Sequence, residues 1–109
     1  MRSIRSGVLL LVLMGVVASA QARPVTKNDI QVCKWGAGVA GFAQQSKLAG
    51  TTLYSARRTL NARHYPKPWM PKMALGITEQ TYASRSRLKP AAISKTYYDG
   101  CIKHDLARK

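Results

Sequence analysis

Residues 26–50 read TKNDIQVCKWGAGVAGFAQQSKLAG. The first four fit a capping box, because the hydroxyl of Thr26 and the carboxylate of Asp29 can each satisfy a free backbone amide at a helix start. Apolar residues then recur at helical spacing as far as Phe42, and Gly50 is a typical residue just beyond a helix end. The pattern predicts a long first helix. Its apolar positions are Val32, Trp35, Val39 and Phe42, with Cys33, Ala37 and Ala40 on a neighbouring stripe.

The predicted first helix contains several glycine and alanine residues. Each of Gly36, Gly38 and Gly41 lowers helix stability by up to about 1 kcal/mol relative to alanine. The pairs Gly36/Ala40 and Ala37/Gly41 are spaced by four, which would let another helix approach closely. We expect this close packing to lie within the domain; a dimer seam and membrane insertion are the alternatives.

A second, shorter helix follows the glycine. Thr51 or Thr52 can cap it, and its apolar positions are Leu53, Ala56 and Leu60. Three prolines within residues 66–71 then remove backbone donors and favour extended geometry, so we expect a loop or hinge there.

Two more helices are expected after this loop. Pro71 lies near the start of the third, whose apolar face is Met70, Met73, Ala74, Ile77 and Thr81 or Tyr82. Pro90 starts the fourth, in which Ile93, Tyr97 and Cys101 share a stripe, while Asp99-Gly100 suggests fraying or an early end. No alternating strand pattern competes. The sequence therefore predicts an all-α fold, a small bundle of about four short helices.

The first residues have the features of a secretory signal. Arg2 and Arg5 precede an apolar run over residues 7–18, and small residues follow, with cleavage expected after Ala20 or Ala22. The run is shorter than the ~20 residues that a membrane-spanning helix needs. We therefore expect an exported protein of the periplasm or the extracellular medium, without a permanent membrane span.

The preferred cleavage makes residues 1–22 the signal peptide and residues 23–109 a single small basic helical domain. A domain of this size buries only about three fifths of its unfolded surface, so a covalent link is favoured. Cys33 and Cys101 can supply a disulfide between the terminal helices, for which loop entropy predicts about 4 kcal/mol. Two free buried thiols are the alternative. Neither a C-x-x-C motif nor a Cys/His cluster is present, so we expect no metal and no cofactor.

Three features together resemble a group of small exported bacterial helical proteins of unknown function. They are the Cys33-Lys34-Trp35-Gly36-Ala37 run, the Gly50 turn before a short helix, and Tyr97-Tyr98-Asp99-Gly100-Cys101. The shared mark of that group is a cysteine in each terminal helix. The resemblance covers most of the mature chain and implies fold and compartment, with no functional residue to carry over.

Charge is the feature that bears on function. The chain has 18 Lys and Arg against 4 Asp and Glu, and loss of Arg2 and Arg5 with the signal leaves a formal charge of about +12. Such an excess favours contact with polyanions. The candidate anion-binding residues fall in three groups: Arg57, Arg58 and Arg63; Lys67 and Lys72; Arg85, Arg87 and Lys89. Tyr65 and Trp69 are the candidate aromatic contacts, able to stack on a base or lie at a lipid headgroup boundary.

These features predict a non-catalytic protein that binds an anionic envelope component or an acidic protein. Nucleic acid is a possible partner, although no nucleic-acid motif is present. A secreted cationic membrane-active or antimicrobial factor is the alternative. A small periplasmic enzyme is disfavoured, because His64 and His104 are the chain's two histidines and no spacing brings a nucleophile, a base and an orienting group together. We therefore expect no catalytic residues, and the sequence does not indicate an oligomeric state.

Overall fold

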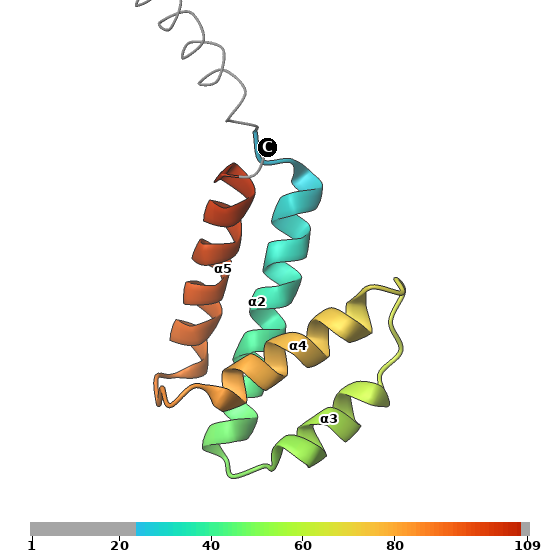
Figure 1. Cartoon of the computed structure of the whole chain (residues 1–109), viewed down its shortest axis with the longest axis vertical. Helices are drawn as coiled ribbons and strands as arrows, with labels where there is room; N and C mark the ends of the chain where they lie inside the picture. Colours follow the sequence, from blue (N-terminus) through green and yellow to red (C-terminus); the bar gives the residue numbers. More distant parts are fainter. Residues whose placement is uncertain (1–23, 108–109) are drawn as a thin grey trace, which may run out of the picture.

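The structure, a computed structural model, describes residues 24–107, so the predicted signal peptide at residues 1–22 lies outside the described residues. The described part contains helices and no strand (Figure 1). With the labels of Figure 1, the helices are α2 (Lys27–Leu48), α3 (Leu53–Asn61), α4 (Met70–Ala83) and α5 (Pro90–Ala107). The predicted all-α class is confirmed.

Helices α2 and α3 begin at the capping residues that the sequence predicts. The hydroxyl of Thr26 accepts from the amide of Asp29 at 3.1 Å, and the Asp29 carboxylate accepts from the amide of Thr26 at 3.0 Å. This is the predicted capping box of α2. Thr52, rather than Thr51, caps α3 by accepting from the amide of Ser55 at 3.1 Å. Gly50 joins the two helices at φ 86°, a conformation that favours glycine.

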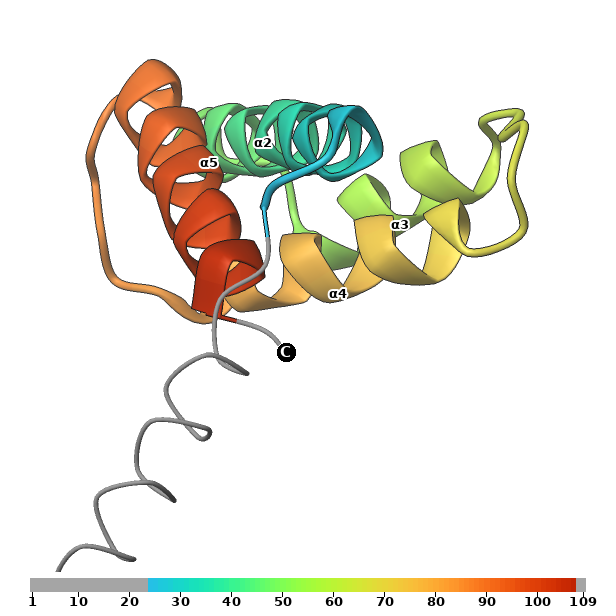
Figure 2. The ribbon, with the colours of Figure 1, turned by 90° about the horizontal axis from the view of Figure 1, so that it is seen from above.

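Helices α2 and α5 run antiparallel and side by side (Figures 1 and 2). Ser94 donates a hydrogen bond to the Ala37 carbonyl at 2.8 Å, and a Cβ atom on Gly41 would lie 3.5 Å from the carbonyl oxygen of Pro90. A Cβ on Gly36 would lie only 2.6 Å from Cε1 of Tyr97. The small residues of α2 therefore admit α5, which confirms the expected close packing within the domain.

The α3–α4 hairpin covers another side of α2 (Figure 2). Its apolar faces close the core, whose buried members are Val39, Ala40, Leu60, Ala74 and Ile77, with Trp35, Phe42, Tyr65, Met73, Leu75, Ile93 and Tyr97 packed around them. The proline-rich segment after α3 is a loop, as predicted. The Tyr65 hydroxyl ties it down by donating to the Leu60 carbonyl at 2.8 Å.

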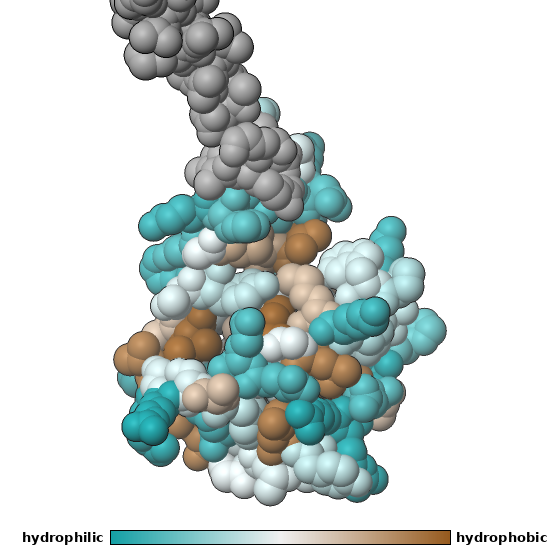
Figure 3. Space-filling model, in the orientation of Figure 1, coloured by the Kyte–Doolittle hydropathy of each residue, from teal (hydrophilic) through white to brown (hydrophobic). Residues whose placement is uncertain are grey.

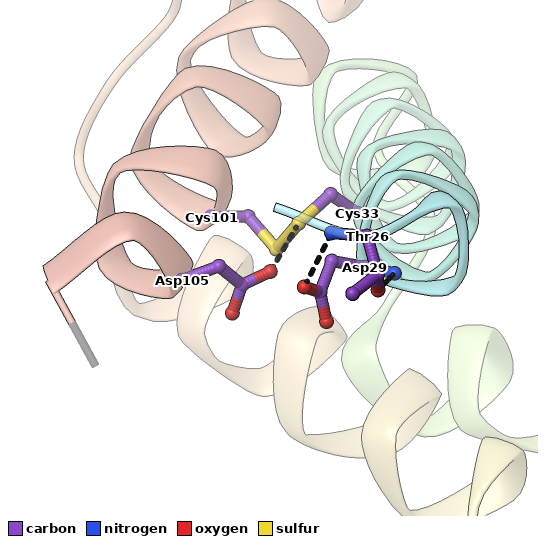
Figure 4. The surroundings of a disulfide bond; sticks show 5 residues. All are labelled: Thr26, Asp29, Cys33, Cys101 and Asp105. Carbon is purple, nitrogen blue, oxygen red and sulfur yellow. Dashed lines mark hydrogen bonds between the residues drawn. A yellow bond between two sulfur atoms is a disulfide. The ribbon is translucent and has the colours of Figure 1, made fainter. Parts of the chain in front are cut away.

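A disulfide joins the first and last helices of the described chain (Figure 4). The Cα atoms of Cys33 and Cys101 are 5.6 Å apart, and neither cysteine is free. The predicted pairing is thus present, and the alternative of two free thiols is not.

The last helix does not end early at Asp99-Gly100, although an early end is one of the two outcomes that this dipeptide suggests. α5 continues through Asp99 and Gly100 to Ala107. Lys95 and Asp99 form an i,i+4 ion pair at 2.6 Å on its surface, and Cys101 holds the turn after Gly100 against α2. These contacts offset the cost of glycine inside a helix.

Candidate anion-binding surface

Two of the four acidic residues are buried near the disulfide (Figure 4). Asp29 belongs to the capping box, and Oδ2 of Asp105 lies 3.5 Å from Sγ of Cys33. A disulfide sulfur carries no proton, so this is a close approach rather than a hydrogen bond. Burial, followed by the charge of Asp105, raises the pKa of Tyr97 above its ordinary value. Neither carboxylate therefore offsets the basic surface from an exposed position.

Ligand atoms of Cys33, Cys101 and Asp105 lie within 4.8 Å of one another. This spacing would suit a metal ion only if the cysteines were thiolates, because the thiolate is the metal ligand. Both sulfurs are held in the disulfide, so the cluster does not offer that donor set.

The other two acidic residues are paired with cations. Glu79 of α4 accepts from Arg57 of α3 at 2.8 Å, and Asp99 accepts from Lys95 within α5 at 2.6 Å. All four acidic side chains of the chain are thus engaged with groups of the protein itself. Apart from Glu79 and Asp99, no side-chain carboxylate of residues 24–107 is exposed to balance the other cations there.

The first candidate group, on α3 and just after it, has partners inside the protein. Arg57 is paired with Glu79, Cζ of Arg58 lies 5.8 Å from the ring centroid of Tyr54, and Cζ of Arg63 lies 4.7 Å from that of Phe42. A ligand at these guanidinium groups would compete with an ion pair and two cation–π contacts.

The second group lies near the proline-rich loop. Lys67 lines a pocket together with Trp69, whereas Lys72 is exposed in the first turn of α4. The two aromatic candidates differ in role. Tyr65 is half-buried, with its hydroxyl bonded to the backbone, while Trp69 is 41% exposed. Tyr65 is therefore mainly structural, and Trp69 is available for contact.

The third group lies on residues 84–89, which link α4 to α5 and are called here the basic connector. They carry no regular secondary structure. The ammonium group of Lys47, near the end of α2, donates to three carbonyl oxygens around its start: Thr81 at 3.0 Å, Ser84 at 2.9 Å and Ser86 at 3.0 Å. All three donors of this ammonium group are used inside the protein.

Gln44 holds the second half of the connector. This fully buried side chain donates to the carbonyl oxygens of Ser86 at 3.0 Å and Leu88 at 2.7 Å. Within the connector, the hydroxyls of Ser84 and Ser86 each accept from the amide two residues later. The backbone is thus fixed from α2 and from within, although it is neither helix nor strand.

The anchoring leaves the basic side chains outside. Arg85, Arg87 and Lys89 are all exposed and occupy alternate positions. Alternate residues of an extended chain lie up to roughly 7 Å apart. Figure 3 shows strongly hydrophilic side chains at the lower left, where the connector runs in Figure 1. The third group therefore places three exposed cations, two residues apart in the sequence, on a backbone held by hydrogen bonds.

Sequence reasoning missed the two residues that hold the connector. Gln44 and Lys47 read as polar residues near a helix end, and their partners lie 34 to 44 residues away. It also did not single out Lys34 and Lys95, which line a shallow groove between α2 and α5. No local pattern marks either arrangement.

A comparison of the chain with protein-family models, curated proteins and solved structures finds no match. Within residues 24–107, none of the helices combines the length and apolar character needed to cross a membrane. His64 and His104 are both exposed. The resemblance to small exported two-cysteine proteins stays a prediction.

Proposed function

We propose that this chain is an exported, non-catalytic protein that binds an anionic partner of the cell envelope through its basic connector. The observation that carries the proposal is the anchoring of residues 84–89 by Gln44 and Lys47. Cations on a backbone held in this way lose less conformational entropy on binding than cations on a loose loop. Arg85 and Arg87 also offer planar guanidinium groups, which suit phosphate and carboxylate oxygens.

The connector is a better binding surface than α3, although α3 has as many arginines. Contact with an anion at Arg57 would draw its guanidinium away from Glu79, and this cost reduces the net gain. The connector cations are exposed, and Lys47 supports the connector backbone through its own hydrogen bonds.

The test compares two triple variants with equal net charge. The first is Arg85→Gln/Arg87→Gln/Lys89→Gln, and the control is Lys27→Gln/Lys34→Gln/Lys103→Gln, which removes three other exposed cations. Protein produced from the full chain and purified in the oxidised form is titrated with phosphatidylglycerol vesicles, lipopolysaccharide and double-stranded DNA, at low and at physiological salt. Tryptophan fluorescence and calorimetry give the affinity.

We expect at least one of these anions to bind at physiological salt, with a loss of tenfold or more in the connector variant and threefold or less in the control. Equal losses in the two variants would mean generic counterion release, which depends on total charge rather than on position. That result, or the absence of binding by the unaltered protein at physiological salt, would contradict the proposal.

A further inference from the structure

A second site lies at the opposite end of α2, between its first turns and the loop that enters α4. It is a pocket of about 250 Å³ that we call the aromatic pocket, formed chiefly by Trp35, Trp69, Met70, Lys67, Asn28 and Gln31. This volume is below the roughly 300 to 1,000 Å³ of pockets for drug-sized ligands, so it suits a single small ring.

The tryptophans give the aromatic pocket a rigid apolar corner. The ring of Trp69 meets that of Trp35 edge to face, with centroids 5.7 Å apart and planes at 85°. Tyr65 packs against Trp35 at 6.3 Å and 82°, and its hydroxyl is fixed to Leu60. A single exposed aromatic residue is ordinary on a protein surface. Here Trp69 is supported by a second ring, which is supported by a third, and still remains 41% exposed.

Two carboxamide groups and one ammonium group border the tryptophan corner of the pocket. Asn28 and Gln31 lie three residues apart, on one face of α2, and both are exposed. Each carboxamide both donates and accepts hydrogen bonds. Lys67 adds a positive charge from the loop, and none of the described residues that line the pocket is an aspartate or a glutamate.

We propose that the aromatic pocket binds a sugar residue that bears a carboxylate, such as a uronic acid unit of an acidic polysaccharide. A pyranose ring has an apolar C–H face that packs on an indole ring. Its hydroxyls donate and accept, as do the carboxamides of Asn28 and Gln31. Its carboxylate complements the ammonium group of Lys67. The pocket combines the three chemistries that such a ring requires.

Other ligands of similar size fit less well. A quaternary ammonium group would be repelled by Lys67. A nucleobase can stack on one indole face, but the nearly perpendicular rings of Trp35 and Trp69 do not form two parallel faces that would enclose it. The aromatic pocket lies at the start of α2, whereas the anchored connector lies near its end. Sugar binding at the pocket therefore goes beyond the proposed function, and either binding activity can be absent without the other.

The experiment uses trigalacturonate as the probe, with the neutral sugar maltotriose and a five-nucleotide thymidine oligomer as comparisons. Trp35 and Trp69 are the chain's two tryptophans, so fluorescence reports directly on the aromatic pocket, and calorimetry gives the affinity independently. The variants are Trp69→Ala and Gln31→Ala. The control is Tyr54→Ala, which removes a ring that is 67% exposed on α3, outside the aromatic pocket. Circular dichroism verifies the helical fold of each variant.

We expect trigalacturonate to bind at least tenfold more tightly than maltotriose. Trp69→Ala should weaken it tenfold or more and Gln31→Ala about three- to tenfold, while Tyr54→Ala and the connector triple variant should change it less than about threefold. Tighter binding of the thymidine oligomer, unchanged affinity in folded Trp69→Ala and Gln31→Ala, or no binding of trigalacturonate would each overturn the proposal. A loss confined to the connector variant would instead place the sugar acid at the connector and remove the aromatic pocket from its recognition.

Discussion

Gly36 and Gly38 are two residues apart in α2, yet their surroundings are opposite. A Cβ atom on Gly36 would lie 2.6 Å from Cε1 and 2.9 Å from the hydroxyl oxygen of Tyr97, and 3.0 Å from Cε of Met73. A Cβ on Gly38 would meet nothing within 4 Å. The two positions therefore separate the packing role of glycine from its cost to helix stability.

We predict that Gly36→Ala destabilises the protein by about 1 to 3 kcal/mol, because the added methyl group must displace the Tyr97 ring at the α2–α5 contact. Gly38→Ala should stabilise it by about 0.5 to 1 kcal/mol, since alanine is the better helix former. Urea unfolding of the two oxidised variants measures both changes. Equal midpoints for the two variants would show that α5 does not pack closely on Gly36.

The backbone of the connector is held by Lys47, a residue of α2 that lies far from it in the sequence. Lys47→Met should lower the free energy of unfolding by about 1 to 3 kcal/mol, because three carbonyl oxygens lose a charged donor. It should also speed amide hydrogen exchange in residues 84–89 and weaken anion binding, although Lys47 has no donor left for the anion. The control is Lys34→Met, on the same helix and exposed, which should change stability by no more than about 0.5 kcal/mol. Equal exchange rates in the two variants would contradict the anchoring role.

The helices themselves were largely predictable, because their signals are local. The Thr26–Asp29 capping box, the threonine cap of α3 and the proline at the start of α5 all act within one helical turn. Asp99-Gly100 is a local signal of fraying or an early end, and α5 continues past it because the disulfide that holds the following turn is a long-range contact.

The candidate site was predictable only in part. Arg85, Arg87 and Lys89 stand out by charge, but so do Arg57, Arg58 and Arg63. The difference lies in partners contributed by other helices, such as Glu79 for Arg57 and Gln44 for the connector. The sequence shows how many cations there are and where they lie along the chain, but only the tertiary contacts show which of them have partners inside the protein.

At the scale of the whole molecule, α2 is the helix on which the others assemble. It contacts α3, α4 and α5, and the disulfide links it to α5 across 68 residues of sequence. The connector and the aromatic pocket lie toward its two ends. Their relative positions therefore depend on the stability of the same helix and its contacts.

We predict that reduction of the disulfide lowers the free energy of unfolding by about 4 kcal/mol, because the unfolded chain regains the entropy that a loop of this length removes. Domains typically have only about 5 to 15 kcal/mol in total, so the reduced protein should be marginally stable. Urea unfolding with and without reductant gives the difference. The Cys33→Ala/Cys101→Ala variant is the control and should not respond to reductant. Equal midpoints for the oxidised and reduced wild-type protein would show that the helices hold the fold without the link.

Asp105 refines this prediction. In the reduced protein the Cys33 thiol gains a proton and can donate to the carboxylate, whose Oδ2 lies 3.5 Å from Sγ in the oxidised form. Such a hydrogen bond contributes about 1 kcal/mol, and the thiols also fill space that the Cys33→Ala/Cys101→Ala variant leaves empty. The reduced wild-type protein should therefore unfold at a higher urea concentration than that variant. The opposite order would contradict this prediction, because it would mean that the buried carboxylate of Asp105 destabilises the neighbouring thiol.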